Sequence, residues 1–99
     1  MDFSDKEIAL LAGRFKILSE PSRLKILRSL FDGERSVNEI VDLTGLLQAN
    51  VSKQLKLLAN ENILQCEQKG LKRYYSIADM TVVQICHLIC ADDEQGETK

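Results

Sequence analysis

Residues 36–77 decide the fold of this chain: SVNEIVDLTGLLQANVSKQLKLLANENILQCEQKGLKRYYSI. The first four residues have a capping-box pattern, in which Ser36 and Glu39 satisfy each other's free amides at a helix start. We therefore predict a helix over about 37–43, ended by Thr44-Gly45 because glycine readily adopts the left-handed conformation of a helix exit.

A second helix is expected over about 48–60, directly after this turn. Its inward face carries Val51, Leu55 and Leu58, and its opposite face carries Ala49, Ser52, Lys53 and Lys56. Leu47 stands where a serine or threonine cap is expected, so this helix start is less well capped. The stretches 63–68 and 72–77 then flank Lys69-Gly70-Leu71, which is typical of a β-hairpin with a glycine-containing loop.

Two more helices precede this stretch. Another capping box over residues 4–7 opens a helix over about 5–18, whose apolar residues recur every three to four positions and mark a buried stripe. That stripe contains Ile8, Leu11, Ala12, Phe15 and Leu18. Pro21 suits the first turn of the next helix, which we expect to end near Asp32-Gly33. Its apolar face contains Leu24, Leu27, Leu30 and Phe31.

A last helix is expected over about 80–91, with Asp79 as its cap. It is apolar around most of its circumference, through Val82, Val83, Ile85, Cys86, Leu88, Ile89 and Cys90. Such a helix must be covered on more than one side, so we predict that it lies in a homodimer interface beside the first helix. Residues 1–91 then form one domain that includes the dimerisation helices, followed by a flexible acidic tail over 92–99.

Composition narrows the class of protein. The chain has 99 residues, 44% hydrophobic and 28% charged, which is ordinary for a soluble globular domain. No apolar run approaches the roughly 20 residues that span a bilayer, so we expect no membrane association. The acidic, amphipathic start lacks the pattern of a signal peptide, and three cysteines without a secretory signal favour reduced thiols. Together these features predict a cytoplasmic protein.

Charge is unevenly distributed along the chain. Residues 47–76 contain five basic and two acidic residues, a net charge of +3, which leaves −5 for the rest because the whole chain carries −2. A basic patch on an acidic body directs one face toward phosphate. A scatter of solvated surface charges is the alternative explanation of this pattern.

A helix, a short turn and a second helix that is polar outside can place the second helix in a DNA major groove. The residues near its start with side chains suited to base edges are Gln48, Asn50, Ser52, Lys53 and Gln54. Lys56 lies one turn further on and is better placed for phosphate. The hairpin residues Lys69, Lys72 and Arg73 suit contact with the backbone or the minor groove.

Three motifs carry a resemblance to a known family. These are L-x-E-P-S-R-L-x-I-L over 18–27, V-S-x-x-L-x-x-L over 51–58 and G-x-x-x-Y-Y-x-I over 70–77. The stretch 18–77 resembles the winged helix-turn-helix of the ArsR/SmtB family of metal- and stress-responsive bacterial repressors. The resemblance implies a mainly α fold with a small β-hairpin, in which residues 1–91 bind DNA and form a homodimer through the first and last helices. It also implies a repressor that binds a near-palindromic operator and is released from it when an inducer binds.

The sequence does not identify the inducer. Arsenic and cadmium sensors of that family carry a Cys-x-Cys motif where this chain has residues 39–43 without a thiol, and the zinc and nickel site of the last helix is degraded by Thr81 and Gln95. The remaining candidates are Cys86, His87 and Cys90, whose soft or borderline ligand atoms suit a thiophilic metal or metalloid ion. Cys86 also fits the helix's apolar stripe as a core residue, which leaves Cys90 as the better ligand or redox residue. A thiol oxidant, or no cofactor at all, remains an alternative.

An enzyme is disfavoured, because the chain has no phosphate-binding glycine loop, no recognisable pair of catalytic carboxylates and a single histidine. A winged-helix protein-interaction module is the more serious alternative, since a fold does not fix a function.

Overall fold

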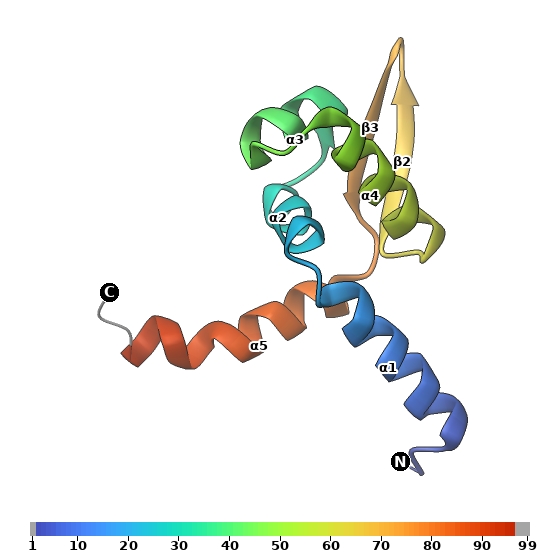
Figure 1. The fold of residues 1–99 in the computed structure, drawn as a ribbon, viewed down its shortest axis with the longest axis vertical. Coiled ribbons are helices and arrows are strands. Elements are labelled where there is room, and N and C mark those ends of the chain that lie inside the picture. The colour runs from blue at the N-terminus through green and yellow to red at the C-terminus, as the bar shows by residue number, and fades with distance from the viewer. Residues whose placement is uncertain (1, 97–99) are drawn as a thin grey trace.

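The computed structural model describes residues 2–96, and the side chains of residues 2–91. Within this part the chain forms α1 (Asp5–Leu18), α2 (Pro21–Ser29), β1 (Arg35–Ser36), α3 (Val37–Thr44), α4 (Gln48–Asn60), β2 (Leu64–Lys69), β3 (Lys72–Ile77) and α5 (Met80–Gly96). Helices α2, α3 and α4 pack together with the sheet, while α1 and α5 diverge from this body (Figure 1). This is the winged helix-turn-helix arrangement that the sequence predicted.

The hydrophobic core lies between α2, α3, α4 and the base of the hairpin. The inward residues predicted for α4, namely Val51, Leu55 and Leu58, are all at most 1% exposed. They pack with residues from every neighbouring element. These are Ile26, Leu27, Leu30, Ile40, Ile63, Leu64, Tyr75 and Val82. Because the core joins both helices of the helix-turn-helix to the wing, it holds the three parts in a fixed arrangement.

The sheet has one strand more than the sequence predicted. β2 and β3 form the expected antiparallel hairpin, with Lys69 opposite Lys72 at its tip. β1 then pairs with β3, with Arg35 opposite Tyr75, so the order is β1-β3-β2. A two-residue strand has no periodicity of its own, and only the long-range pairing with β3 defines it.

The predicted helix caps are confirmed. Ser4 with Glu7 and Ser36 with Glu39 both form complete capping boxes, and Gly45 ends α3 in the left-handed conformation with φ of 72°. Leu47 makes no side-chain cap bond, as expected. Asp79 caps α5 by accepting a hydrogen bond of 3.0 Å from the backbone amide of Thr81.

Two predicted helix ends were wrong. α2 ends at Ser29, before Asp32-Gly33, because the amide of Leu30 bonds to the carbonyl of Leu27 and the chain tightens into a turn. The backbone of α5 continues to Gly96 rather than ending near 91. Residues 97–99 of the expected tail lie outside the described residues.

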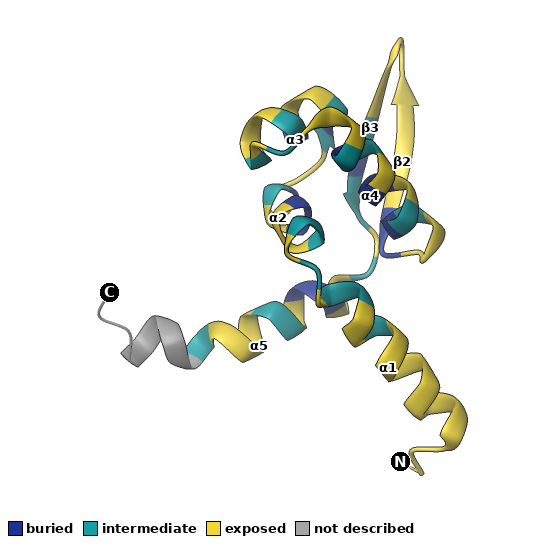
Figure 2. Cartoon of the chain, in the orientation of Figure 1, coloured by how far each residue is buried: buried dark blue, intermediate teal, exposed yellow. Residues whose placement is uncertain are grey.

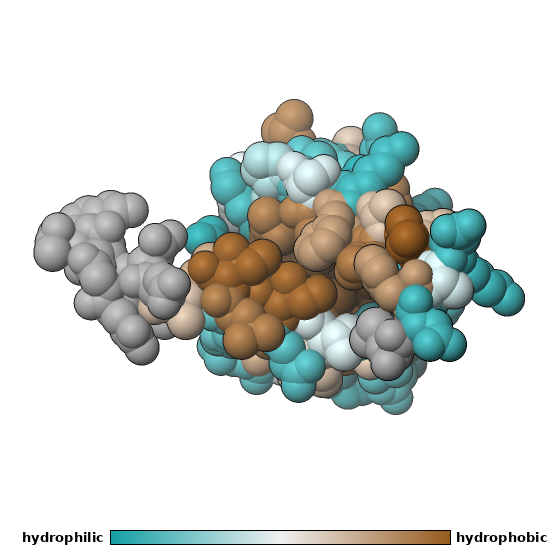
Figure 3. All heavy atoms as spheres, turned by 90° about the horizontal axis from the view of Figure 1, so that it is seen from below, coloured by the Kyte–Doolittle hydropathy of each residue, from teal (hydrophilic) through white to brown (hydrophobic). Residues whose placement is uncertain are grey.

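The apolar stripe of α1 is not buried within the chain, contrary to expectation. No residue of this 14-residue helix is buried, and Phe15 remains 49% exposed (Figure 2). On α5, Leu88 and Ile89 are 76% and 68% exposed. Seen from below, apolar side chains gather over the face from which the two helices project (Figure 3). The pattern identified an apolar face correctly, but apart from Leu18, which packs against the core, the described chain leaves the stripe of α1 exposed.

No helix in the described part of the chain is both long enough and apolar enough to cross a membrane.

Candidate nucleic-acid interface

The turn between α3 and α4 sets how α4 is presented. Thr44 donates its hydroxyl hydrogen to the carbonyl of Ile40 at 2.7 Å, and its Oγ1 accepts from the amide of Leu46 at 3.3 Å. With Gly45 in the left-handed conformation, the chain reverses and starts α4 within three residues. The turn therefore fixes the orientation of α4 relative to α3, against which it packs.

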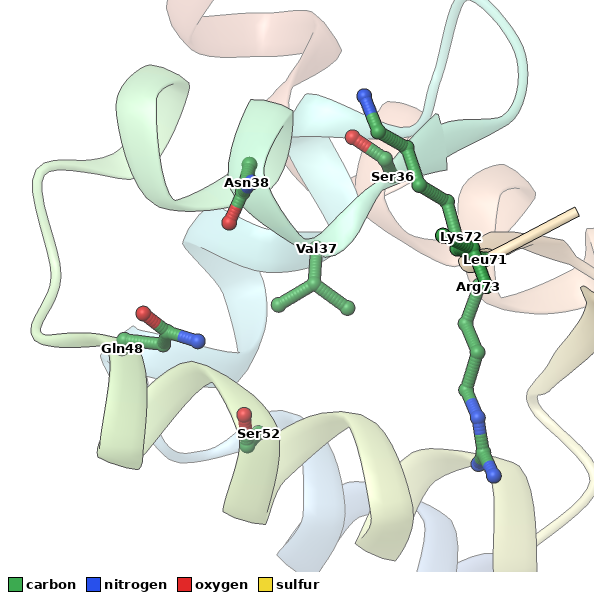
Figure 4. Close-up of a pocket in the computed structure, with 8 residues that line it drawn as sticks. All are labelled: Ser36, Val37, Asn38, Gln48, Ser52, Leu71, Lys72 and Arg73. Atoms are coloured by element: carbon green, nitrogen blue, oxygen red, sulfur yellow. The ribbon is translucent and has the colours of Figure 1, made fainter.

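A hollow of about 340 Å³ lies between the start of α3, the start of α4 and the hairpin tip with β3. Gln48 and Ser52 border it from α4, and Arg73 extends from β3 toward α4 (Figure 4). Gln48, Lys53 and Lys56 are exposed and Ser52 is half-buried, so four of the predicted DNA-contacting residues of α4 are accessible. The outer face of α4 and the wing thus border a single polar, basic surface.

Two other predicted base-reading residues are placed differently. Gln54 is only 7% exposed: its Oε1 accepts from Arg23 Nε at 2.9 Å, and its Nε2 donates to Asn50 Oδ1 at 3.0 Å. Asn50 in turn donates to the hydroxyl of Ser22 at 3.4 Å. The amide of Gln54 is occupied by the protein itself, so this residue does not share the exposed face on which we expected it.

Helical spacing contained a signal for the burial of Gln54. The residue lies three positions after Val51 and four before Leu58, both of which are fully buried. Residues at these spacings share one helix face. We expected the side chain of Gln54 to point outward because glutamine is polar. Its position on the helix places it instead on the inward face.

The three basic residues of the wing differ in their surroundings. Lys69 pairs with Glu34, which precedes β1, and its Nζ lies 5.3 Å from the centre of the Tyr74 ring. The hydrogen bond to Glu34 raises the pKa of Lys69 above its usual range. Lys72 and Arg73 are exposed on β3. The charge of Lys69 is therefore partly offset within the protein, an effect of Glu34 that the sequence analysis missed.

Glu39 adds one negative charge near this surface. The hydrogen bond from the backbone of Ser36 lowers the pKa of Glu39, and the charges of Arg35 and Lys72 contribute in the same direction. Glu39 therefore stays ionised to a lower pH than a glutamate without these partners, which preserves the capping box at the start of α3.

The cysteines of α5 face the end of α1 rather than the DNA-facing surface. Cys86 is half-buried and Cys90 is exposed, and both line an apolar hollow of about 320 Å³ between α5, α1 and α2. The other residues of its wall are Phe15, Leu18, Ser19, Leu24, Ile85 and Ile89. Burial raises the pKa of the Cys86 thiol, and the nearby Cys90 raises it further, so Cys86 is protonated at neutral pH.

His87 does not join the two cysteines. Its ring packs against Phe31, with ring centres 5.8 Å apart, on the side of α5 that faces the end of α2. Among the described residues, no three His, Cys, Asp or Glu side chains come together as a metal-binding group. Asp79 is engaged with Thr81 and lies 3.4 Å from Arg14, and the side chains at positions 92 and 95 lie outside the described residues.

Comparisons with known proteins define the class. The family model of the bacterial regulatory proteins of the arsR family matches residues 20–65, which cover the end of the α1–α2 connection through the start of β2. The solution structure of the homodimeric winged helix-turn-helix DNA-binding domain of Mb0332 from Mycobacterium bovis, a possible ArsR-family regulator, is 32% identical. It aligns over 96% of this chain and 93% of that one, with a TM-score of 0.77. This chain belongs to the ArsR family.

Two other relatives have names that mention a metal or metalloid. The probable mercury resistance operon repressor of Streptomyces lividans is 33% identical over 80% of this chain and 66% of its own length. The crystal structure of the antimony-specific repressor AntR matches with a TM-score of 0.87 at 27% identity, over 99% of this chain and 90% of that one. The chain spans about two thirds of the mercury repressor's length, and 39% and 64% of two mycobacterial relatives. Membership of a family of regulators agrees with our interpretation that the chain is not an enzyme.

Proposed function

We propose that this chain is a dimeric, sequence-specific DNA-binding repressor that acts in the cytoplasm. One observation carries the proposal: the exposed outer face of α4 and the basic wing border the same hollow on one side of the molecule. A helix presented in this way enters a major groove, while a neighbouring hairpin contacts the backbone or the minor groove.

A second copy of the chain completes the molecule. Much of the apolar faces of α1 and α5 is uncovered: Phe15 is 49% exposed, Leu88 76% and Ile89 68%. Apolar surface of this extent favours association with an identical surface, which gives a two-fold symmetric dimer. Two reading helices related by two-fold symmetry match two half-sites about one helical turn apart, so the operator is near-palindromic.

Contacts divide between base reading and backbone binding. Gln48, Ser52 and Lys53 stand at the exposed start of α4 and are assigned to base edges. Lys56, Lys72 and Arg73 are assigned to phosphates, together with Lys69 once it separates from Glu34. Gln54 and Asn50 are assigned to the contact between α2 and α4.

Binding to a fragment of the chain's own upstream promoter tests the proposal. Lys53→Glu and Arg73→Glu should each abolish binding, because each places two negative charges per dimer against phosphate. Lys6→Glu is the matched control: it makes the same charge change in the first turn of α1, at the opposite end of the molecule from the wing (Figure 1). Unchanged promoter affinity in the Lys53 and Arg73 variants would favour a winged-helix module that binds another protein.

We further propose that Cys90, with Cys86, receives the inducer, a thiophilic metal, metalloid or thiol oxidant. The two thiols are four residues apart on α5 and open into one hollow that also touches α1. The exposed Cys90 reacts first, because Cys86 is half-buried and less accessible. The names of the mercury and antimony repressors support this class of inducer.

The inducer proposal has its own experiment. Release from the promoter fragment is measured with zinc, nickel, cadmium, arsenite, peroxide and polysulfide. Cys90→Ser should lose the response while keeping DNA affinity, and Cys66→Ser, which removes an exposed thiol on β2, should keep both. A Cys90→Ser protein that every one of these agents still releases would remove Cys90 from the mechanism.

A further inference from the structure

Arg23 connects three helices through one side chain. It is the third residue of α2, and its Nη1 donates to the carbonyl oxygen of Ile17 in the last turn of α1 at 3.0 Å. Its Nε donates to Oε1 of Gln54 on α4 at 2.9 Å. Its own backbone amide is held by the carboxylate of Glu20, the cap of α2. The guanidinium is therefore fixed at its base and spans from α1 to α4.

The link continues within α4 and returns to α2. The buried amide of Gln54 donates to Asn50, whose amide donates to the hydroxyl of Ser22. Both ends of the Gln54 amide are thus satisfied inside the protein, and no buried side-chain polar atom in the described part of the chain lacks a partner. A satisfied polar network of this kind has one preferred geometry, because every alternative leaves a buried group unpaired.

We propose that Arg23 is a positioning residue that couples the orientation of α4 to the position of α1. The inference rests on the proposed function, in which α1 meets the partner subunit and α4 enters DNA. The same side chain then transmits the geometry of the dimer to the reading helix, and it sets the distance and angle between the two helices that reach the operator.

The hollow that holds the two α5 thiols adjoins this link. Its wall includes Phe15, Leu18 and Ser19, which lie on either side of Ile17 in the sequence. It also includes Leu24, the residue after Arg23. Anything that shifts the end of α1 there moves the carbonyl to which Arg23 is bonded. One route from the hollow to α4 therefore runs through this guanidinium, beside the direct packing of α2 on α4.

Lysine cannot replace arginine in this role. The planar guanidinium carries several donors in a rigid fork, so it bonds to the Ile17 carbonyl and the Gln54 amide at once. An ammonium group keeps the charge but is a compact point donor on a flexible chain. Arg23→Lys therefore separates the effect of geometry from that of charge.

The test compares Arg23→Met, Arg23→Lys, Gln54→Met and the double variant Arg23→Met/Gln54→Met with the wild type. Affinity is measured at one salt concentration for the promoter fragment and for a scrambled duplex of equal length. We expect promoter affinity to fall about tenfold in each single variant, the equivalent of one lost base contact. Affinity for the scrambled duplex should stay unchanged, because phosphate contacts tolerate small rotations of α4.

The double variant should lose no more than either single variant, since both remove the same link. The proposal would be overturned if affinity fell equally for both duplexes, or if Arg23→Lys kept the wild-type promoter affinity. It would also be overturned if the losses of promoter affinity added up in the double variant. Should Arg23→Met fail to fold, Arg23→Lys and Gln54→Met carry the same comparison.

Amide hydrogen exchange separates this proposal from the proposed function. Faster exchange is expected across α4 in Arg23→Lys and Gln54→Met, while α3 keeps its protection. If the wild type does not distinguish the two duplexes, the proposed function fails, and exchange in α4 still decides the role of Arg23. Exchange that is unchanged in both variants would overturn the positioning role.

Discussion

Removing the charge of Arg73 should change how operator binding depends on salt. Arg73 is exposed on β3 and extends toward α4, across the hollow from Gln48 and Ser52, where a phosphate would approach (Figure 4). Each phosphate that the protein neutralises contributes about −0.9 to the slope of log K against log salt. A dimer contains two copies, so Arg73→Gln should make the slope shallower by about 1.8.

That change is large enough to measure. Between about 50 and 200 mM salt, the wild type should lose about twelvefold more affinity than Arg73→Gln. Fluorescence anisotropy with a labelled operator duplex at several sodium chloride concentrations gives both slopes. Lys6→Gln is the charge-matched control on α1 and should leave the slope unchanged. An unchanged slope in Arg73→Gln, or the same change in Lys6→Gln, would refute a phosphate contact at Arg73.

The remaining predictions concern the wing, the caps and the dimer. Glu34→Gln frees Lys69 for phosphate, so operator affinity should rise and the slope of log K against log salt should steepen by about 1.8. Weaker operator binding with a shallower slope would mean that the Lys69–Glu34 pair positions the wing instead. Ser36→Ala removes a cap and should lower the free energy of unfolding by about 1 kcal/mol, and the melting temperature by about 5 °C at fixed protein concentration. Hydrogen bonding lowers the pKa of Glu39 in the folded protein. The stabilisation from ionised Glu39 is therefore present above the pKa of the unfolded chain and is lost as the pH falls through the lower folded pKa. Acid titrations followed by circular dichroism should show a flatter loss of stability in Glu39→Gln. Ile89→Asp places a charge on the exposed face of α5 and should give a monomer by light scattering with weakened operator binding, whereas a stable dimer would locate the interface elsewhere.

Most of the helix and strand positions could be predicted because their signals are local. The capping boxes at Ser4 and Ser36, the glycine exit at Gly45 and the apolar spacing within α4 all act within a few residues. The α2 terminus was placed too late, because Leu30 and Phe31 continue the apolar pattern through a turn. A pattern records which face is apolar, and it does not record where backbone bonding changes from helix to turn.

The candidate site was predicted only in part. The exposed residues of α4 and the wing lie on one side of the molecule, as the order of motifs indicated. His87 was grouped with Cys90 because residues three apart are neighbours on a helix surface, yet its ring packs against Phe31. Helical spacing makes such a pair possible, but the direction of the imidazole ring depends on what packs against it, here a residue beyond the end of α2.

The amino-acid sequence by itself determined which segments are helices, where they are capped, which faces are apolar and which segment is basic. These are properties of short stretches of chain, decided by backbone conformation and by side-chain spacing. Only the tertiary structure decided which polar side chains are available to a ligand. Gln54 looks like a base reader until Arg23, thirty-one positions earlier, is seen to occupy its amide, and Lys69 looks free until Glu34 is seen beside it. Hydrogen bonds and ion pairs between distant segments depend on how the helices pack, and no local pattern encodes them.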